Sequence, residues 1–304
     1  MTENVVETTG LTKRYGDVNA VVDLSLTVPK GTVFGLLGPN GAGKTTIIGT
    51  LLGLIRPTAG TIRLFGSEIN GSTDEAVRRI GAIMETPAFY PYLSGRDNLR
   101  YFQGIAGSDG ENEIERLLEL VDLTGRADAR FNTYSLGMKH RLGIAYSLLG
   151  DPELLLLDEP TNGLDPSGMA EVRELLRELG NGERTIVLAS HLLNEVEQVC
   201  DHVAILSEGS VIAEGEVRDL IGRRDRLRLV TTDNLAAGRI LAQLEWIGSV
   251  GESGDALLVE AAPDRAGELS EALARSGVYP TELRMVSTSL EEYFLEVTVG
   301  EEES

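Results

Sequence analysis

A glycine-rich stretch directly after an apolar run constrains this sequence more than any other feature. The apolar run is Val33–Leu37, and the stretch after it reads Gly38-Pro39-Asn40-Gly41-Ala42-Gly43-Lys44-Thr45, which fits G-x-x-x-x-G-K-[ST]. A helical pattern follows at once and begins with Thr46. Between a strand and a helix, glycines let backbone N–H groups converge on phosphate oxygens, and the helix N-terminus adds a partial positive charge. The sequence therefore predicts an ATP site at these residues, with Lys44 on the outer phosphates and the Thr45 hydroxyl offered to Mg²⁺.

Two carboxylates at the end of a second apolar run supply the partner that a phosphate loop needs. Four leucines at 154–157 predict a buried strand, and Asp158 and Glu159 follow it. The carboxyl ends of neighbouring parallel strands lie side by side, so both acids are expected beside the phosphate loop. Asp158 suits Mg²⁺ bound through water, and Glu159 suits a general base that polarises the attacking water. The alternative is that these acids only open a surface turn before Pro160.

The charge balance limits the partners of the chain. Among 304 residues, 27 Lys and Arg stand against 48 Asp and Glu, which gives a net charge of −21. General nucleic-acid binding needs cations at phosphates, so this balance argues against it. No apolar run approaches the ~18 residues of a spanning helix, and the N-terminus lacks the basic start and apolar core of a secretory signal. We therefore expect any membrane role to need a partner.

The cysteine and two of the histidines are interpreted as structural. Cys200 is the single cysteine, which excludes an intramolecular disulfide. No histidine-containing constellation surrounds it in the sequence, so a reduced, buried thiol is favoured over a nucleophile. His140 and His202 are likewise expected to have structural roles.

Apolar runs and helical patterns divide the chain into two expected domains. They alternate over about the first 220 residues, which is typical of a largely parallel sheet covered by helices, so the fold class is α/β over 1–222. Strand signals vanish between about 87 and 150, where we expect an inserted helical subdomain. Residues 223–304 predict a small α+β domain.

The expected elements of the second domain follow one order. Strands are predicted near 226–231, 248–251, 256–261 and 280–286, and helices near 233–244 and 265–275. This order, β-α-β-β-α-β, suggests a ferredoxin-like unit. A last helix is expected at 289–297, with Ser289 as its N-cap and Glu292 three residues on. The sequence leaves open whether this domain holds an accessory ligand site or a dimer contact.

Four further motifs, taken with the phosphate loop, resemble the ATP-binding proteins of ABC transporters. Ser135-Leu136-Gly137-Met138-Lys139 is similar to the signature motif of that family, and Asn162-Gly163-Leu164-Asp165 is similar to its D-loop. His191 resembles the switch histidine, and Tyr15 resembles the aromatic A-loop. Order and spacing match over about 4–220. The resemblance implies an ABC ATPase core of the P-loop NTPase class, with the helical subdomain inserted in it.

The resemblance also implies roles for these residues. Tyr15 would stack on adenine, and His191 would hold the γ-phosphate and the catalytic water. Ser135 and Gly137 would contact the γ-phosphate of ATP bound to the opposite subunit, and Asp165 would help to link the two sites. Plainer alternatives are an exposed aromatic for Tyr15, an N-cap for Ser135 and a capping role for His191.

One position departs from the family pattern and indicates a branch. Where the family usually has Gln, this sequence has Glu85, which can ligate Mg²⁺ but adds negative charge near the γ-phosphate. Glu85, the stretch Pro87–Leu93 and the residues 289–295 resemble the branch of bacitracin- and lantibiotic-type exporters. We hypothesise that Glu85 binds Mg²⁺ and couples ATP to a membrane partner. The aromatic stretch Phe89–Leu93 is either a packed loop or a docking patch for that partner.

The leading hypothesis is the ATPase subunit of an ABC exporter. Two copies, as a homodimer or as paired ATPase subunits, would sandwich ATP and drive a separate transmembrane permease. The chain would be cytoplasmic and peripheral at the inner face of the cell membrane. The expected substrate is an antibiotic, drug or peptide, before a lipid or polysaccharide. The single phosphate loop and the charge of −21 disfavour an ABC ATPase that works on ribosomes or DNA. Intact Glu159 and His191 disfavour a module that holds ATP without hydrolysing it.

Overall fold

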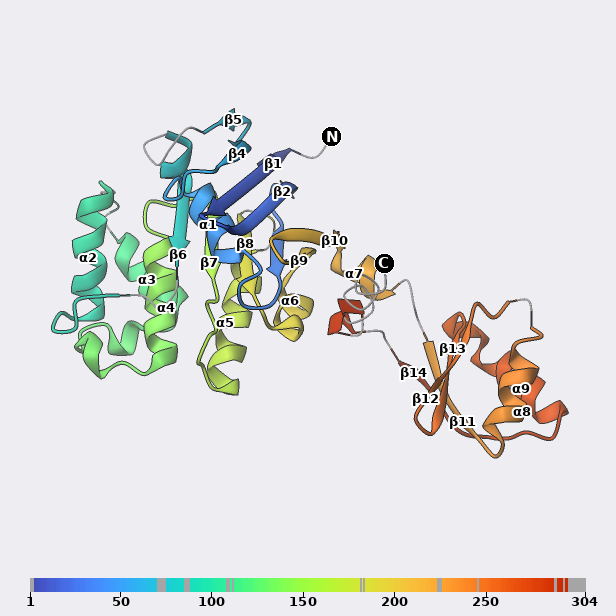
Figure 1. Ribbon diagram of the computed structural model, residues 1–304. Coiled ribbons are helices and arrows are strands. Elements are labelled where there is room, and N and C mark those ends of the chain that lie inside the picture. The colour runs from blue at the N-terminus through green and yellow to red at the C-terminus, as the bar shows by residue number, and fades with distance from the viewer. Residues whose placement is uncertain are drawn as a thin grey trace. The chain divides into compact units, whose positions relative to one another are not determined.

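The computed structural model describes residues 3–69, 75–84, 88–107, 110, 112–180, 182, 184–222, 226–244, 246–286, 289–291 and 293–294. It divides into two compact units, Met1–Glu216 and Val217–Ser304 (Figure 1). The sequence placed the domain boundary after residue 222. The difference is helix α7 (Val217–Gly222), which groups with the second unit.

The first unit is built on a six-stranded sheet of order β10-β9-β3-β8-β7-β6. Its strands are β3 (Val33–Leu37), β6 (Ile80–Ile83), β7 (Leu154–Asp158), β8 (Thr185–Ser190), β9 (His202–Ser207) and β10 (Ser210–Glu216). Neighbours from β9 to β6 are parallel, whereas β10 runs antiparallel to β9. Every residue of β3, β7 and β8 is buried, because both faces of the sheet are covered, and these strands are accordingly mostly apolar.

Helices lie on both faces of this sheet. α1 (Lys44–Leu51) packs against β7 and β8, and α6 (Leu193–Val199) packs against β3 and β8, with α5 (Pro166–Leu179) beside α6. Side chains alternate along β3, so that Phe34 faces the core around α1 while Gly35 faces α6. A Cβ at Gly35 would lie 2.7 Å from Val196 Cγ1, so glycine lets α6 approach the sheet closely.

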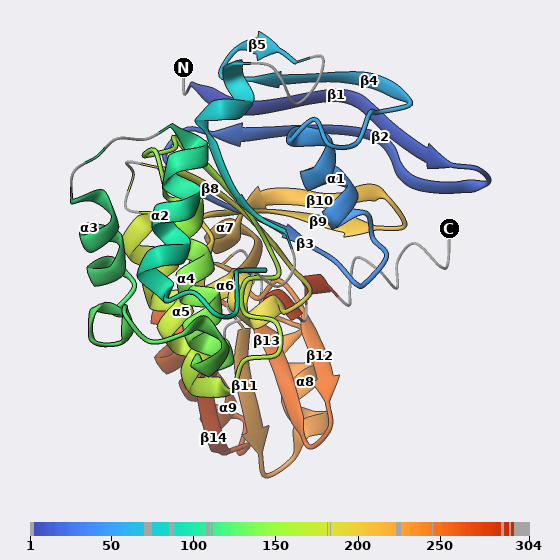
Figure 2. The same cartoon turned by 90° about the vertical axis from the view of Figure 1, so that its left-hand side faces the viewer.

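A second, antiparallel sheet lies across α1 from the first. Its order is β2-β1-β4-β5, and its strands are β1 (Asn4–Tyr15), β2 (Val18–Pro29), β4 (Ala59–Leu64) and β5 (Ser67–Glu68). Figure 2 shows α1 between the two sheets. One core joins all three layers, since buried Val6 and Leu64 from this sheet cluster with Ile47 and Ile48 of α1 and with Phe34. The sequence prediction did not include this sheet.

The segment between β6 and β7 is helical, as the sequence predicted. Its helices are α2 (Gly95–Ala106), α3 (Glu113–Leu120) and α4 (Leu136–Ser147), with 3₁₀ turns η2 (Thr124–Arg126) and η3 (Phe131–Thr133); another, η1 (Glu75–Arg79), precedes β6. Serine side chains start two of these helices: Ser94 accepts from Asp97 N, and Ser135 accepts from Met138 N. α4 packs on β6 at Gly81, where a Cβ would collide with the carbonyl oxygen of Ser147.

The second unit has the predicted order of elements. These are β11 (Arg226–Thr231), α8 (Asn234–Leu241), β12 (Val250–Ser253), β13 (Ala256–Glu260), η4 (Pro263–Arg265), α9 (Ala266–Arg275) and β14 (Pro280–Val286). The sheet order is β12-β13-β11-β14 with antiparallel neighbours, so each helix connects two strands that one other strand separates. This is the split β-α-β connectivity of the predicted ferredoxin-like unit. Of the helix expected at 289–297, Leu290, Glu291, Tyr293 and Phe294 are helical, while Glu292 and 295–297 lie outside the described residues.

Among the described residues, none of the helices combines the length and apolar character needed to cross a membrane.

Candidate functional site

The glycine-rich stretch forms a loop between β3 and α1. Gly41 and Gly43 have positive φ angles of 88° and 98°, and Gly43 is the N-cap of α1. Such angles are open to glycine and strained for other residues, so the sequence here follows from the backbone path. Lys44 begins the helix and is 6% exposed. Its Nζ donates to Gly38 O at 2.7 Å and to Pro39 O at 3.2 Å, which holds the ammonium inside the loop.

Two acids from the end of β7 contact this loop. Asp158 Oδ2 accepts a 2.7 Å hydrogen bond from Thr45 Oγ1. Glu159 Oε1 lies 3.4 Å from Lys44 Nζ, and Glu159 Oε2 lies 2.8 Å from His191 Nδ1. These residues follow β3, β8 and β7, which are consecutive in the sheet, so their carboxyl ends meet at one edge. The sequence predicted that the acids follow a strand next to that of the phosphate loop, whereas β8 lies between β3 and β7. The structure thus brings together five residues that the sequence singled out.

The backbone of Glu159 is strained. Its φ angle is 49°, in the left-handed region that costs a residue with a Cβ about 1–2 kcal/mol. Glu159 N donates to Ala189 O at 2.9 Å, and Glu159 O accepts from Asn162 N at 3.1 Å. Strain of this kind collects at functional sites, where the surroundings hold it in place. Here it directs the carboxylate toward Lys44 and His191.

The oxygen atoms of Thr45 and Asp158 fit a magnesium ion. Mg²⁺ prefers oxygen ligands and is usually held by one or two protein groups together with substrate phosphates. The hydroxyl of Thr45 and the buried carboxylate of Asp158 converge to 2.7 Å at the start of α1. In the described part of the chain no group of three or more His, Cys, Asp or Glu could hold a metal ion unaided. The donor set therefore suits a metal that arrives with a phosphate.

The remaining predicted site residues lie elsewhere in the first unit. Tyr15 ends β1; the residue is 47% exposed, and Lys13 Nζ lies 4.7 Å from the centroid of its ring. Ser135 caps α4, and Asp165 caps α5 by accepting from Gly168 N. No hydrogen bond or ion pair joins these three to the phosphate loop within the described ranges. Gly137 lies in the first turn of α4, with open space where a Cβ would be.

Glu85 lies outside the described residues, and so does Pro87. The part of the aromatic stretch from Phe89 onward is described. Phe89 packs edge-on against Phe102, Phe131 and Tyr146, with ring centroids 5.2–5.9 Å apart. A cavity of about 240 Å³ adjoins this cluster, lined by Ala82, Ile83, Met84, Ala88, Phe89, Phe102 and Tyr146. Tyr92, by contrast, is 77% exposed, so the stretch is partly packed and partly presented to solvent.

His140, expected to be structural, makes a contact that the sequence does not show. It is buried on α4, and its Nδ1 lies 2.6 Å from the carbonyl oxygen of Pro160, the residue after Glu159. Burial lowers the pKa of His140, so the ring is neutral near pH 7. The sequence shows neither the contact nor the burial, because α4 and Pro160 meet only through the tertiary fold. His202, on β9, stacks on Phe34 at 6.5 Å, in keeping with the structural role expected for it.

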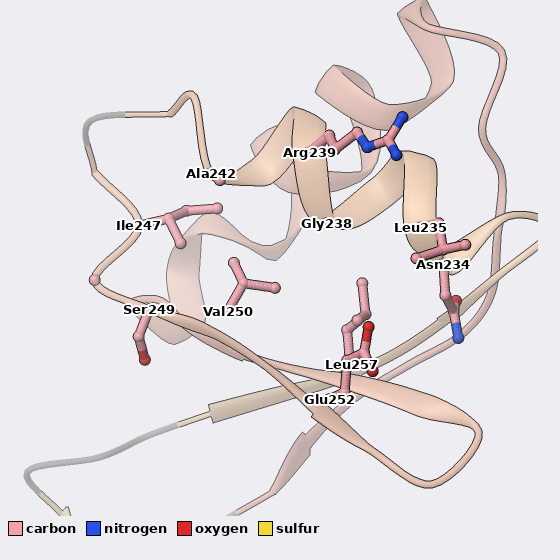
Figure 3. A pocket seen from close by; sticks show the side chains of 11 residues that line it. Asn234, Leu235, Gly238, Arg239, Ala242, Ile247, Ser249, Val250, Glu252 and Leu257 are labelled. Carbon is pink, nitrogen blue, oxygen red and sulfur yellow. The ribbon is translucent and has the colours of Figure 1, made fainter.

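The second unit has a cavity of its own. It has a volume of about 400 Å³ and lies between α8 and the hairpin β12–β13, where Ile247, Val250 and Leu257 point into it (Figure 3). Gly238 of α8 lines it, and a Cβ there would meet no atom within 4 Å. The described residues that line this cavity include no lysine, threonine or aspartate, which are residue types that meet at the phosphate loop.

Comparisons with known proteins agree with this geometry. The family model described as ABC transporter matches residues 21–162. The chain is 38% identical over 301 residues to the bacitracin transport ATP-binding protein BcrA of Enterococcus faecalis, covering 98% of this chain and 97% of that one. It is 38% identical over 303 residues to the daunorubicin/doxorubicin resistance ATP-binding protein DrrA of Streptomyces peucetius, covering 96% and 92%. Among solved structures, cbiO1 of Clostridium perfringens, part of the ABC transporter complex cbiONQ, superposes with a TM-score of 0.65 at 27% identity, covering 72% of this chain and 90% of that one. With its phosphate loop, acidic pair and signature helix in one fold, the chain belongs to the family of ABC transporter ATP-binding proteins.

Proposed function

We propose that the chain hydrolyses ATP and that Glu159 is the general base. The observation that carries the proposal is the position of this carboxylate, between Lys44 at 3.4 Å and His191 at 2.8 Å. Glu159 would take a proton from the attacking water, and His191 would orient the carboxylate and that water. Lys44 would leave its bonds to Gly38 O and Pro39 O and bind the outer phosphates. Mg²⁺ at Thr45 and Asp158 would neutralise charge that develops on the phosphates.

The test is the rate of phosphate release by the purified chain. Glu159→Gln keeps the size of the side chain and removes the base, so we expect a rate lower by about 10²-fold or more with ATP still bound. Removing Mg²⁺ with a chelator should also abolish turnover. Glu178→Gln, at an exposed position of α5, is the matched control and should keep the rate of the unaltered chain. An unchanged rate in Glu159→Gln removes Glu159 as the base.

We further propose that two copies form the working unit. Among the described residues of one chain, the side chain of Ser135 accepts from Met138 N of its own helix and makes no hydrogen bond to the phosphate loop. In a homodimer, or with a paired ATPase subunit, Ser135 and Gly137 would reach the γ-phosphate of the opposite copy, Asp165 would link the sites, and Tyr15 would stack on adenine. The rate per chain should therefore fall on dilution. A rate that stays high and independent of concentration contradicts this.

A separate membrane permease is the proposed partner, and it would place the chain on the inner face of the cell membrane. The proposed contact is the aromatic stretch, because Tyr92 is exposed beside the packed ring of Phe89. Tyr92→Ala should leave hydrolysis by the isolated chain unchanged and reduce the amount of permease that co-purifies. We also propose that Glu85 binds Mg²⁺ and couples ATP to this partner. Unchanged hydrolysis and transport in Glu85→Gln would rule that out.

The proposed cargo is an antibiotic or drug, because two relatives that span nearly the whole chain are a bacitracin transport protein and a daunorubicin/doxorubicin resistance protein. Expression of the chain together with its permease in a sensitive host should raise the inhibitory concentration of bacitracin or daunorubicin. Glu159→Gln should remove that resistance. A host that becomes no more resistant to either compound excludes these two cargo classes.

A further inference from the structure

His140 occupies an unusual place on the helix that begins at the signature serine. It lies beyond Ser135 on α4, and its side chain is 3% exposed. A carbonyl oxygen only accepts hydrogen bonds, so Nδ1 of the neutral ring carries the proton and donates it to Pro160 O at 2.6 Å. Nε2 is buried without a hydrogen-bond partner in the described structure. A buried nitrogen left unpaired costs about 1–3 kcal/mol, so an apolar side chain would be the cheaper filler if packing were its only role.

The acceptor of this bond adjoins the strained residue of the site. Glu159 has a φ of 49°, and its own N–H and C=O are bonded to Ala189 O and Asn162 N. The bond from His140 fixes the next carbonyl along the chain, that of Pro160. Consecutive peptide groups around Glu159 are therefore held from both sides, and α4 provides one of the restraints.

Other contacts join α4 to the same stretch of chain. A Cβ at Gly163 would lie 3.3 Å from Leu136 Cδ2, so the D-loop passes close to the first residue of α4. Arg141, next to His140, approaches Glu171 of α5 with 3.7 Å between Nη2 and Oε2. The two helices also pack directly on each other. A displacement of α4 would therefore act on the segment from Pro160 to α5.

We propose that His140 is a positioning residue whose hydrogen bond to Pro160 ties the orientation of the Glu159 carboxylate to the place of α4. The inference rests on the proposed role of Glu159 as base. It extends that role by naming what aligns the base: the helix that carries Ser135 and Gly137 also holds the backbone of Glu159. Hydrolysis then responds to the position of the signature helix through one side chain of the same subunit.

The first test separates kcat from ATP binding. His140→Leu fills much of the same space without a donor, and we expect kcat to fall about tenfold or more, since small misplacements of a catalytic group are costly. The affinity for a fluorescent ATP analogue should stay within about twofold, because the phosphate loop is untouched. His140→Asn places an amide nitrogen where Nδ1 lies and should restore most of the rate. His202→Asn is the matched control, because His202 has no proposed role in hydrolysis; its kcat and its affinity for the ATP analogue should equal those of the unaltered chain.

The outcomes separate this inference from the proposed function. If the unaltered chain hydrolyses ATP and His140→Leu does so equally fast, the positioning role falls while the role of Glu159 stands. Equal losses of kcat and ATP affinity in His140→Leu, or no recovery in His140→Asn, indicate a general structural role and overturn the proposal. A chain that does not hydrolyse ATP at all removes both ideas.

A spectroscopic test remains decisive if His140→Leu does not fold. The chain has three histidines, so the ring N–H signals in ¹⁵N-histidine-labelled protein can be assigned with single His→Asn variants. The Nδ1–H signal of His140 should be present in the full-length Glu159→Gln chain and should shift when ATP is added. A signal that does not change with ATP, while ATP binding is verified in the same sample, overturns the proposal.

Discussion

Three positions of the phosphate loop require glycine for two different physical reasons, namely the space for a Cβ and the backbone φ angle. At Gly38 a Cβ would lie 2.5 Å from Leu206 O and 3.0 Å from Ala42 Cβ, while the backbone φ is ordinary. At Gly41 the φ is 88° and nothing lies within 4 Å. At Gly43 the φ is 98° and a Cβ would also collide with Ala20 O. Alanine therefore meets a packing conflict at Gly38, a conformational conflict at Gly41 and both at Gly43.

The expected costs follow from these conflicts. Overpacking costs about 1–3 kcal/mol, which is the expectation for Gly38→Ala. A positive φ costs alanine about 1–2 kcal/mol, which is the expectation for Gly41→Ala. Gly43→Ala combines the two, so its loss of unfolding free energy should be about 2–5 kcal/mol. With a urea dependence of about 2 kcal/mol per molar, Gly43→Ala should unfold about 1 M earlier than Gly41→Ala.

Urea unfolding followed by far-UV circular dichroism measures these losses. The only tryptophan, Trp246, is partly buried and packs against the core of the second unit, so its fluorescence reports on that unit. The transition seen by Trp246 should be the same in all three variants, which makes it an internal control. Equal losses in Gly41→Ala and Gly43→Ala would refute the reasoning, because the contact with Ala20 would then cost nothing. So would a Gly38→Ala variant as stable as the unaltered chain.

Three other predictions concern stability and reactivity. Burial lowers the pKa of His140, whereas a histidine in the unfolded chain titrates near about 6.5. The free energy of unfolding should therefore fall as the pH drops below that value, because the unfolded state then binds the proton more readily. The urea midpoints at about pH 7.5 and about pH 5.5 should differ less in His140→Asn than in the unaltered chain. Burial also raises the pKa of the Cys200 thiol, so iodoacetamide should label it only after urea unfolds the chain, and fast labelling of the native protein would contradict this. Gly104→Ala, in α2 with open space at its Cβ, should raise the thermal midpoint through a gain of about 0.5–1 kcal/mol.

The sequence predicts those parts of the fold whose signals are local. Buried parallel strands such as β3, β7 and β8 are short apolar runs between polar turns, and the run at 154–157 is the plainest of them. The antiparallel sheet was missed because β1 and β2 mix exposed and buried positions irregularly, with bulges that shift their register. Its apolar residues make sense only once α1 lies between the two sheets.

The site divides in the same way. Lys44, Thr45, Asp158 and Glu159 could be found because each sits at the end of an apolar strand or in a glycine motif. The sequence also predicts that both acids lie beside the loop, but not which atoms pair, because the distances between them depend on the strand order β3-β8-β7, which brings together residues far apart in sequence. The contact of His140 with Pro160 depends in the same way on α4 packing against the chain that follows β7.

The contacts within one chain explain why the phosphate loop should not act alone. Lys44 is bonded to the loop's own carbonyls and paired with Glu159, so its charge is already satisfied when no phosphate is present. Under the proposed function, ATP would therefore compete with Glu159 for Lys44 and would free the carboxylate for water. In the proposed dimer the outer side of the γ-phosphate would receive its donor from the second copy, because among the described residues of one chain the side chains of Ser135 and Asp165 bond to their own helices and not to the phosphate loop. As a cap Ser135 only accepts, so its hydroxyl can still donate. The N-terminus of α4 from a second copy would supply that donor together with a partial positive charge, so in this proposal the closure of two chains is the step that makes Glu159 effective.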